Sequence, residues 1–149
     1  MEIVLIAMVT AAAWTDLRTR RIPNWIPVLG AIMGVILGGL SSLAGAALGF
    51  GIFFVLYIAG GMGAGDVKLF SAVGALVGPQ QVIVVFIFTG LIGGIAALAL
   101  SVSRGRLRET INRTSALAVG IRTAATPESL RLPYGAVIAA GTLVYLVSR

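Results

Sequence analysis

The chain of 149 residues contains only two aspartates, and each one stands at the edge of an apolar stretch. Asp16 follows apolar residues 2–14, and Asp66 ends a Gly-Ala-Gly-Asp tetrapeptide shortly after apolar residues 42–58. An ionisable side chain at the edge of a bilayer is costly and therefore marks a candidate functional position. The matched pair indicates two carboxylates that act together on one substrate.

Two carboxylates that share one proton can hydrolyse an amide without any other reactive group. One acts as a base toward water and the other as an acid toward the scissile carbonyl, because neighbouring like charges do not both ionise. The chain has no cysteine and no histidine, which excludes thiol nucleophiles, histidine bases, disulfides and Cys/His zinc sites. The few glutamates lie far from both aspartates in sequence, so we expect no metal and no cofactor.

Each aspartate also has a structural interpretation. Asp66 follows a glycine-rich turn and could cap the helix after it, while Asp16 could pair with Arg18 or Arg20. A serine–lysine pair would instead use Lys68 and Ser71, one helical turn apart. The glycines before Asp66 allow positive φ and close approach of a substrate strand. The dyad interpretation depends on both aspartates lying on one side of a membrane.

Composition predicts an all-α integral membrane protein. Hydrophobic residues make up 58% of the chain and charged residues 11%, with a mean hydropathy of +1.05, whereas a soluble domain carries roughly a quarter charged residues. We expect one domain over residues 1–149, a bundle of six transmembrane helices whose first is retained and is not a cleaved signal. The predicted segments are residues 2–17, 24–40, 43–60, 66–78, 81–102 and 132–148, with a loop at 103–131.

The basic residues predict the orientation of this bundle. Ten of the eleven lie in the loops after the first, third and fifth segments, and the other is at the C-terminus. By the positive-inside rule that face is cytoplasmic, so both aspartates lie there and both termini are extracytoplasmic. The net charge of +6 thus reflects topology, and we expect no nucleic acid partner. Loop 103–131 is either a basic amphipathic helix on anionic lipid or a mobile loop.

Glycines recur one turn apart within the segments, which permits close helix packing in lipid. A tight bundle accounts for them, and a homodimer face is the alternative. The helix ends also distinguish the aspartates: Asp66 begins its predicted helix, where the dipole favours an anion, and Asp16 ends one. We therefore expect Asp16 to hold the shared proton more often. The arginines after it oppose that assignment, and a coupled pair titrates as a unit.

Three motifs resemble those of one known family, the type IV prepilin peptidases. Residues 15–24, Thr-Asp-Leu-Arg-Thr-Arg-Arg-Ile-Pro-Asn, resemble its first aspartate motif. Residues 61–69, Gly-Met-Gly-Ala-Gly-Asp-Val-Lys-Leu, resemble its Gly-x-Gly-Asp motif with the trailing lysine. Residues 132–135, Leu-Pro-Tyr-Gly, resemble the Pro-Phe/Tyr-Gly element of its last helix. The three occur in the family's order along nearly the whole chain.

The resemblance implies an aspartic endopeptidase of the bacterial cytoplasmic membrane, surrounded by lipid, that removes the basic leader from prepilins after a glycine. It implies Asp16 and Asp66 as the catalytic pair. Six further residues would shape the site or the substrate path: Gly63, Gly65, Lys68, Pro133, Tyr134 and Gly135.

The chain departs from the longer family members, which have an N-terminal cytoplasmic domain with Cys-x-x-Cys motifs and also methylate the new N-terminus. It is similar to the short peptidases of tight-adherence (Flp-type) pilus systems, so we do not expect methyltransferase activity. Preflagellin peptidases share the dyad. The sequence also leaves open a presenilin-like intramembrane protease and a non-enzymatic subunit of a secretion or transport complex.

Overall fold

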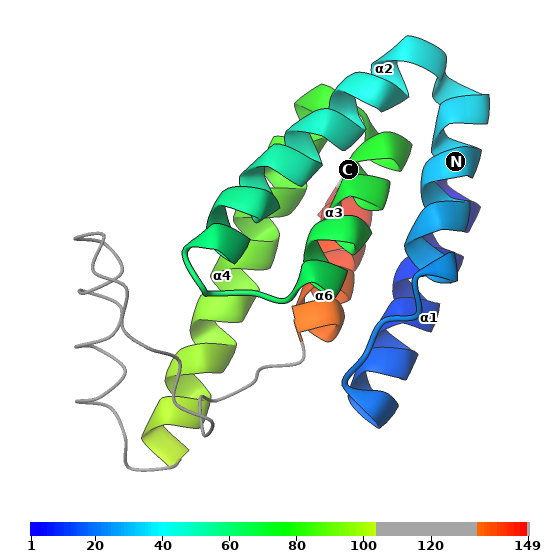
Figure 1. Ribbon diagram of the computed structural model, residues 1–149. Helices are drawn as coiled ribbons and strands as arrows, with labels where there is room; N and C mark the ends of the chain where they lie inside the picture. The colour runs from blue at the N-terminus through cyan, green and yellow to red at the C-terminus, as the bar shows by residue number, and fades with distance from the viewer. Residues whose placement is uncertain (104–133, 149) are drawn as a thin grey trace.

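The computed structural model describes residues 1–103 and 134–148 of the chain. Every regular element in these two ranges is a helix, as the sequence predicts, and no strand occurs within them. Figure 1 shows the helices packed side by side as a bundle. Their bounds are α1 Glu2–Thr19, α2 Trp25–Ile58, α3 Ala64–Val77, α4 Pro79–Ser103 and α6 Tyr134–Ser148. The predicted loop 103–131 lies outside the described residues beyond Ser103.

Helix α2 combines the second and third predicted segments, and the break predicted between them near residue 40 is a sharp kink at Gly39. The chain reverses at Gly39, whose φ of 58° and ψ of −135° are non-helical. The hydroxyl of Ser42 donates to the carbonyl oxygen of Gly34 at 2.7 Å and closes this bend. Figure 1 shows one half of α2 on each side of the reversal. A single glycine replaces a loop because positive φ costs it little.

Helix α3 is the most enclosed element and packs backbone to backbone against α2. A Cβ added at Gly34 would lie 2.9 Å from the backbone of Ala75, and one added at Gly45 would lie 2.9 Å from the backbone of Gly78. The rings of Phe53 and Phe70 stack between the two helices with centroids 4.0 Å apart. Glycine therefore brings these helices together, as the spacing of small residues predicted.

Helix α6 packs against α1 and α4. A Cβ added at Gly141 would lie 2.7 Å from the backbone of Thr89 in α4, and one added at Gly93 would lie 3.1 Å from Val137. The N-terminus of α1 and the end of α6 lie at the same end of the bundle as the α2 reversal (Figure 1). The opposite end gathers the end of α1 and the beginnings of α3 and α6.

Within the described part of the chain, two helices are long and apolar enough to cross a membrane by length and composition, Trp25–Ile58 and Pro79–Leu100. Their outward faces expose large apolar side chains, among them Ile36, Leu40 and Val55. A soluble monomer rarely exposes so much apolar surface. Because α2 reverses at Gly39, it contributes two shorter segments. The count of six spans and the extracytoplasmic position of both termini stay predictions.

Candidate active site

Asp16 lies near the end of α1 and is only 7% exposed. The helix ends because Arg20 adopts φ 51° and ψ 31°, and its N–H donates to the carbonyl oxygen of Asp16 at 2.8 Å. Arg20 is the only non-glycine residue with positive φ in the described ranges. A left-handed residue stops a helix and turns the chain. After this turn, the side chain of Ile22 lies close to Gly135, as the carboxylate of Asp16 does.

Asp66 lies in the first turn of α3 and is 8% exposed. Its Oδ2 accepts the N–H of Gly63, the N-cap residue, at 3.1 Å. The interpretation of Asp66 as the N-cap of a helix that starts at residue 67 is therefore wrong, because α3 begins at Ala64 and Asp66, its third residue, accepts the N–H of the N-cap residue. Gly63 and Gly65, before Asp66, do not use the positive φ that glycine allows. Gly63 is extended, Gly65 is helical, and the positive-φ residue of this turn is Gly60.

The two aspartates are brought near enough to interact electrostatically. Neither forms an ion pair with any residue that the structure describes. The proposed partner Arg18 instead places its guanidinium over the ring of Trp14, 4.2 Å from the centroid, an ordinary cation–π distance. Both side chains are more than nine-tenths buried, and burying a carboxylate costs free energy unless a hydrogen bond or an opposite charge compensates.

The beginning of α6 completes the site. The backbone N–H of Gly135 donates to Oδ2 of Asp16 at 2.8 Å, and Tyr134 interacts electrostatically with Asp66. Ile22 packs between the segments, since a Cβ added at Gly135 would lie 3.0 Å from its Cδ1 and one added at Gly65 would lie 3.7 Å from its Cβ. The three motifs thus meet at one place. Pro133 lies outside the described residues.

Lys68 also joins two motifs, through a residue that the sequence analysis did not select. Its Nζ donates to Oδ1 of Asn24 at 3.0 Å on the exposed surface. Asn24 follows the Ile-Pro pair of the first motif, and this position in the motif is the sequence feature that could have identified it. The serine–lysine interpretation lacks support, because the hydroxyl of Ser71 donates to the carbonyl oxygen of Ala46 at 3.0 Å. Lys68 and Ser71 therefore face different partners.

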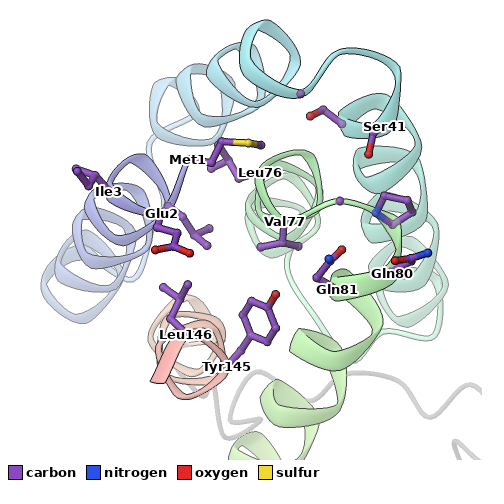
Figure 2. Close-up of a pocket in the computed structure, with 15 residues that line it drawn as sticks. Met1, Glu2, Ile3, Ser41, Leu76, Val77, Gln80, Gln81, Tyr145 and Leu146 are labelled. Atoms are coloured by element: carbon purple, nitrogen blue, oxygen red, sulfur yellow. The ribbon is translucent and has the colours of Figure 1, made fainter. Parts of the chain in front are cut away.

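A cavity of about 770 Å³ lies at the other end of the bundle. Figure 2 shows Glu2, Gln81 and Tyr145 around it, with Val77 and Leu146. Neither aspartate lines it. In residues 1–103 and 134–148, no three histidine, cysteine, aspartate or glutamate side chains come together as a metal site would require. The buried carboxylates among the described residues are those of Asp16 and Asp66.

Known proteins resemble most of this chain in sequence. Residues 3–98 match the model of the type IV leader peptidase family. The chain is 33% identical over 130 residues to the prepilin leader peptidase/N-methyltransferase of Bacillus subtilis (strain 168), covering 79% of this chain and 52% of the relative. It is 27% identical over 122 residues to the protein of that name from Xanthomonas campestris pv. campestris, covering 72% and 42%.

The chain spans about half the length of these curated relatives. No solved structure matches it significantly. The matched residues include both aspartates, and the apolar helices together with the family indicate an integral membrane protein. The resemblance inferred from the three motifs is confirmed, and the chain belongs to the type IV leader peptidase family.

Proposed function

We propose that this chain is a membrane-embedded aspartic endopeptidase that removes the leader peptide of Flp-type prepilins at the cytoplasmic face of the bacterial inner membrane. Asp16 and Asp66 are its catalytic dyad. The observation that supports this most directly is the burial of two mutually interacting carboxylates from separate helices, 7% and 8% exposed. The names of the curated relatives point to the same reaction.

The chemistry follows from one shared proton. The ionised carboxylate takes a proton from a water molecule as the water oxygen attacks the scissile carbonyl carbon, and the protonated carboxyl donates its proton to the carbonyl oxygen. The tetrahedral intermediate then collapses: the ionised carboxylate takes a proton from one of its hydroxyl groups, the C–N bond breaks, and the leaving nitrogen receives a proton from the other carboxyl. The dyad thus ends with one shared proton, as it began. The products are the free leader and a pilin with a new amino terminus.

The residues around the dyad have supporting roles in this proposal. Gly63 and Gly65 keep side chains away from the approach to Asp66, so that a substrate strand can come close. Tyr134, beside Asp66, lies where it can contact the substrate or the dyad. Lys68, held by Asn24, fixes the beginning of α3 against the segment that follows α1.

Residues 1–149 form one peptidase domain in this proposal, with the predicted six spans and both termini outside. The substrate is a prepilin leader with its following apolar helix, and lipid surrounds the bundle. A homodimer is compatible with the glycines of α4 that have open space beside them, Gly90 and Gly94. Methyl transfer is not part of the proposal, because the dyad accounts for hydrolysis only.

Co-expression with the prepilin of the same gene cluster tests the proposal. Mass measurement of the pilin should show loss of the leader after a glycine with the wild type. The full-length precursor should remain with Asp16→Asn and with Asp66→Asn, while membrane insertion of each variant persists. Near-normal cleavage by either variant would refute the dyad.

The position of the cut distinguishes prepilin cleavage from the competing functions. A presenilin-like protease would cut within the spanning helix of its substrate, and a preflagellin peptidase would accept a preflagellin in place of the prepilin. A non-enzymatic subunit would produce no cut and would tolerate alanine at both aspartates.

A further inference from the structure

Asp16, which lies in α1, forms a hydrogen bond with the backbone of another helix, α6. Gly135 is the second described residue of α6, and its N–H donates to a side chain outside that helix, as N–H groups of a first helical turn do. That N–H donates to Oδ2 of Asp16 at 2.8 Å, across 119 positions of sequence, and the contact is buried. The carboxylate of Asp16, near the end of α1, therefore accepts a backbone N–H from the first described turn of α6.

This contact changes the electrostatic comparison of the two aspartates. Position within α1 places Asp16 where a helix dipole disfavours an anion, but α6 turns its N-terminus toward the same carboxylate, where an anion is favoured. Asp66 lies at the N-terminus of its own helix α3. Both carboxylates thus face a helix N-terminus.

The contact requires glycine at position 135. A Cβ there would lie 2.8 Å from Oδ2 and 3.0 Å from Cβ of Asp16, and 3.0 Å from Cδ1 of Ile22. Real Cβ atoms essentially never approach within 3.0 Å, so a side chain would move Asp16 or the end of α6. The φ of Gly135 is not positive. Close approach is therefore the reason for glycine, and conformational freedom is not.

We propose that Gly135 is a positioning residue for the dyad. Its N–H fixes the carboxylate of Asp16 opposite Asp66, and its missing side chain lets the beginning of α6 come near enough to do so. Helix α6 thereby assembles the site although neither aspartate belongs to it. The proposal rests on the proposed function for its kinetic consequence, whereas the hydrogen bond itself can be tested without a substrate.

The test uses the fact that the chain has only two aspartates. In the Asp66→Asn background, aspartate labelled with ¹³C at the carboxyl gives an infrared carboxyl signal from Asp16 alone. Gly135→Ala should shift that band, because the N–H···O bond is lost or lengthened. The control is Gly141→Ala in the same helix, whose Cβ would meet the backbone of Thr89 at 2.7 Å. It should disturb packing without shifting the band.

Activity gives the second measurement. We expect Gly135→Ala to lower kcat for leader cleavage by about 10²-fold, the usual cost of misplacing a catalytic group by about 1 Å, with KM nearly unchanged. Gly141→Ala should lower thermal stability at least as much and leave kcat within about threefold. Adding Ile22→Val to Gly135→Ala removes Cδ1, one of the three crowding atoms, and should restore part of kcat.

The outcomes are distinguishable. An unshifted band in Gly135→Ala, or equal losses of kcat in the two alanine variants, overturns the positioning role. If Gly135→Ala does not fold, the double variant with Ile22→Val provides the infrared measurement, and an unshifted band there overturns the role as well. A shifted band in the Asp66→Asn background, combined with a wild-type protein that cleaves no prepilin, leaves the positioning role standing and refutes the proposed function.

Discussion

The two ends of the bundle differ: one contains two buried carboxylates, and the other contains a cavity. At one end, Asp16 and Asp66 are buried and held by backbone N–H groups from Gly135 and Gly63. At the other end lies a cavity of about 770 Å³ with polar lining residues, including Glu2. The end with the two aspartates is so tightly packed that a Cβ added at Gly135 would collide with the carboxylate of Asp16.

The comparison shows that buried charge marks the candidate site better than volume does. Burying a carboxylate costs free energy unless hydrogen bonds compensate, and the aspartate end supplies one backbone donor to each carboxylate. The cavity end contains a single acidic side chain among its lining residues. One carboxylate cannot provide both the acid and the base that a dyad requires.

The largest expected effect comes from matched carboxylate-to-amide changes at the two ends. Asp16→Asn and Asp66→Asn should each lower the rate of leader cleavage by roughly 10²–10⁴-fold or more, since each removes an acid or base. The double variant should be no worse than either single one, because the pair acts as a unit. Glu2→Gln, the same chemical change at the cavity end, should cleave at nearly the wild-type rate. A loss in Glu2→Gln as large as in the aspartate variants would remove the distinction between the ends.

A smaller effect, on stability, is expected where α2 meets α3 near the cavity end. Gly45→Ala places a Cβ against the backbone of Gly74 and Gly78 and should destabilise the fold by about 1–3 kcal/mol through overpacking. Unfolding in detergent by heat or denaturant measures this. The matched control is Gly51→Ala in the same helix, where a Cβ would meet nothing within 4 Å. It should be neutral or stabilising by up to about 1 kcal/mol. Equal destabilisation by both would contradict the packing.

The hydrogen bond between Lys68 and Asn24 tests the outer rim of the aspartate end. Because the contact is exposed, Lys68→Met should lower kcat/KM by only about two- to fivefold, a net value typical of one hydrogen bond. Asn24→Ala should have a similar effect. The double variant should lose less than the product of the two, and strictly multiplicative losses would mean that the two side chains act separately.

The smallest effect is expected from filling the cavity. Val77→Phe places a larger side chain against the hollow and should leave leader cleavage within about twofold, as substitutions away from a functional site usually do. The rate of cleavage by the purified variant in the same detergent measures it. A tenfold loss would show that the cavity end takes part in the reaction.

Much of the fold was predictable because helices and their ends depend on local sequence. Apolar stretches set the positions of α1, α3, α4 and α6 to within a few residues. The boundary near residue 40 was predicted as a loop, whereas one residue with positive φ, Gly39, makes the reversal. Nothing local distinguishes Gly39 from the neighbouring Gly38, so the position of the bend depends on the packing of the two halves of α2.

The candidate site was likewise predictable from the sequence only in part. The sequence determined the pair of aspartates, because the absence of cysteine and histidine and the charge pattern of the loops are properties of composition and order. The tertiary structure decided the contacts around them. These are the hydrogen bond from the N–H of Gly135 to Asp16, the packing of Ile22 against Gly135, and the hydrogen bond from Lys68 to Asn24. These contacts join segments far apart in the chain and depend on how closely helices approach. That distance is set by side chains on all of them together, and no single segment encodes it.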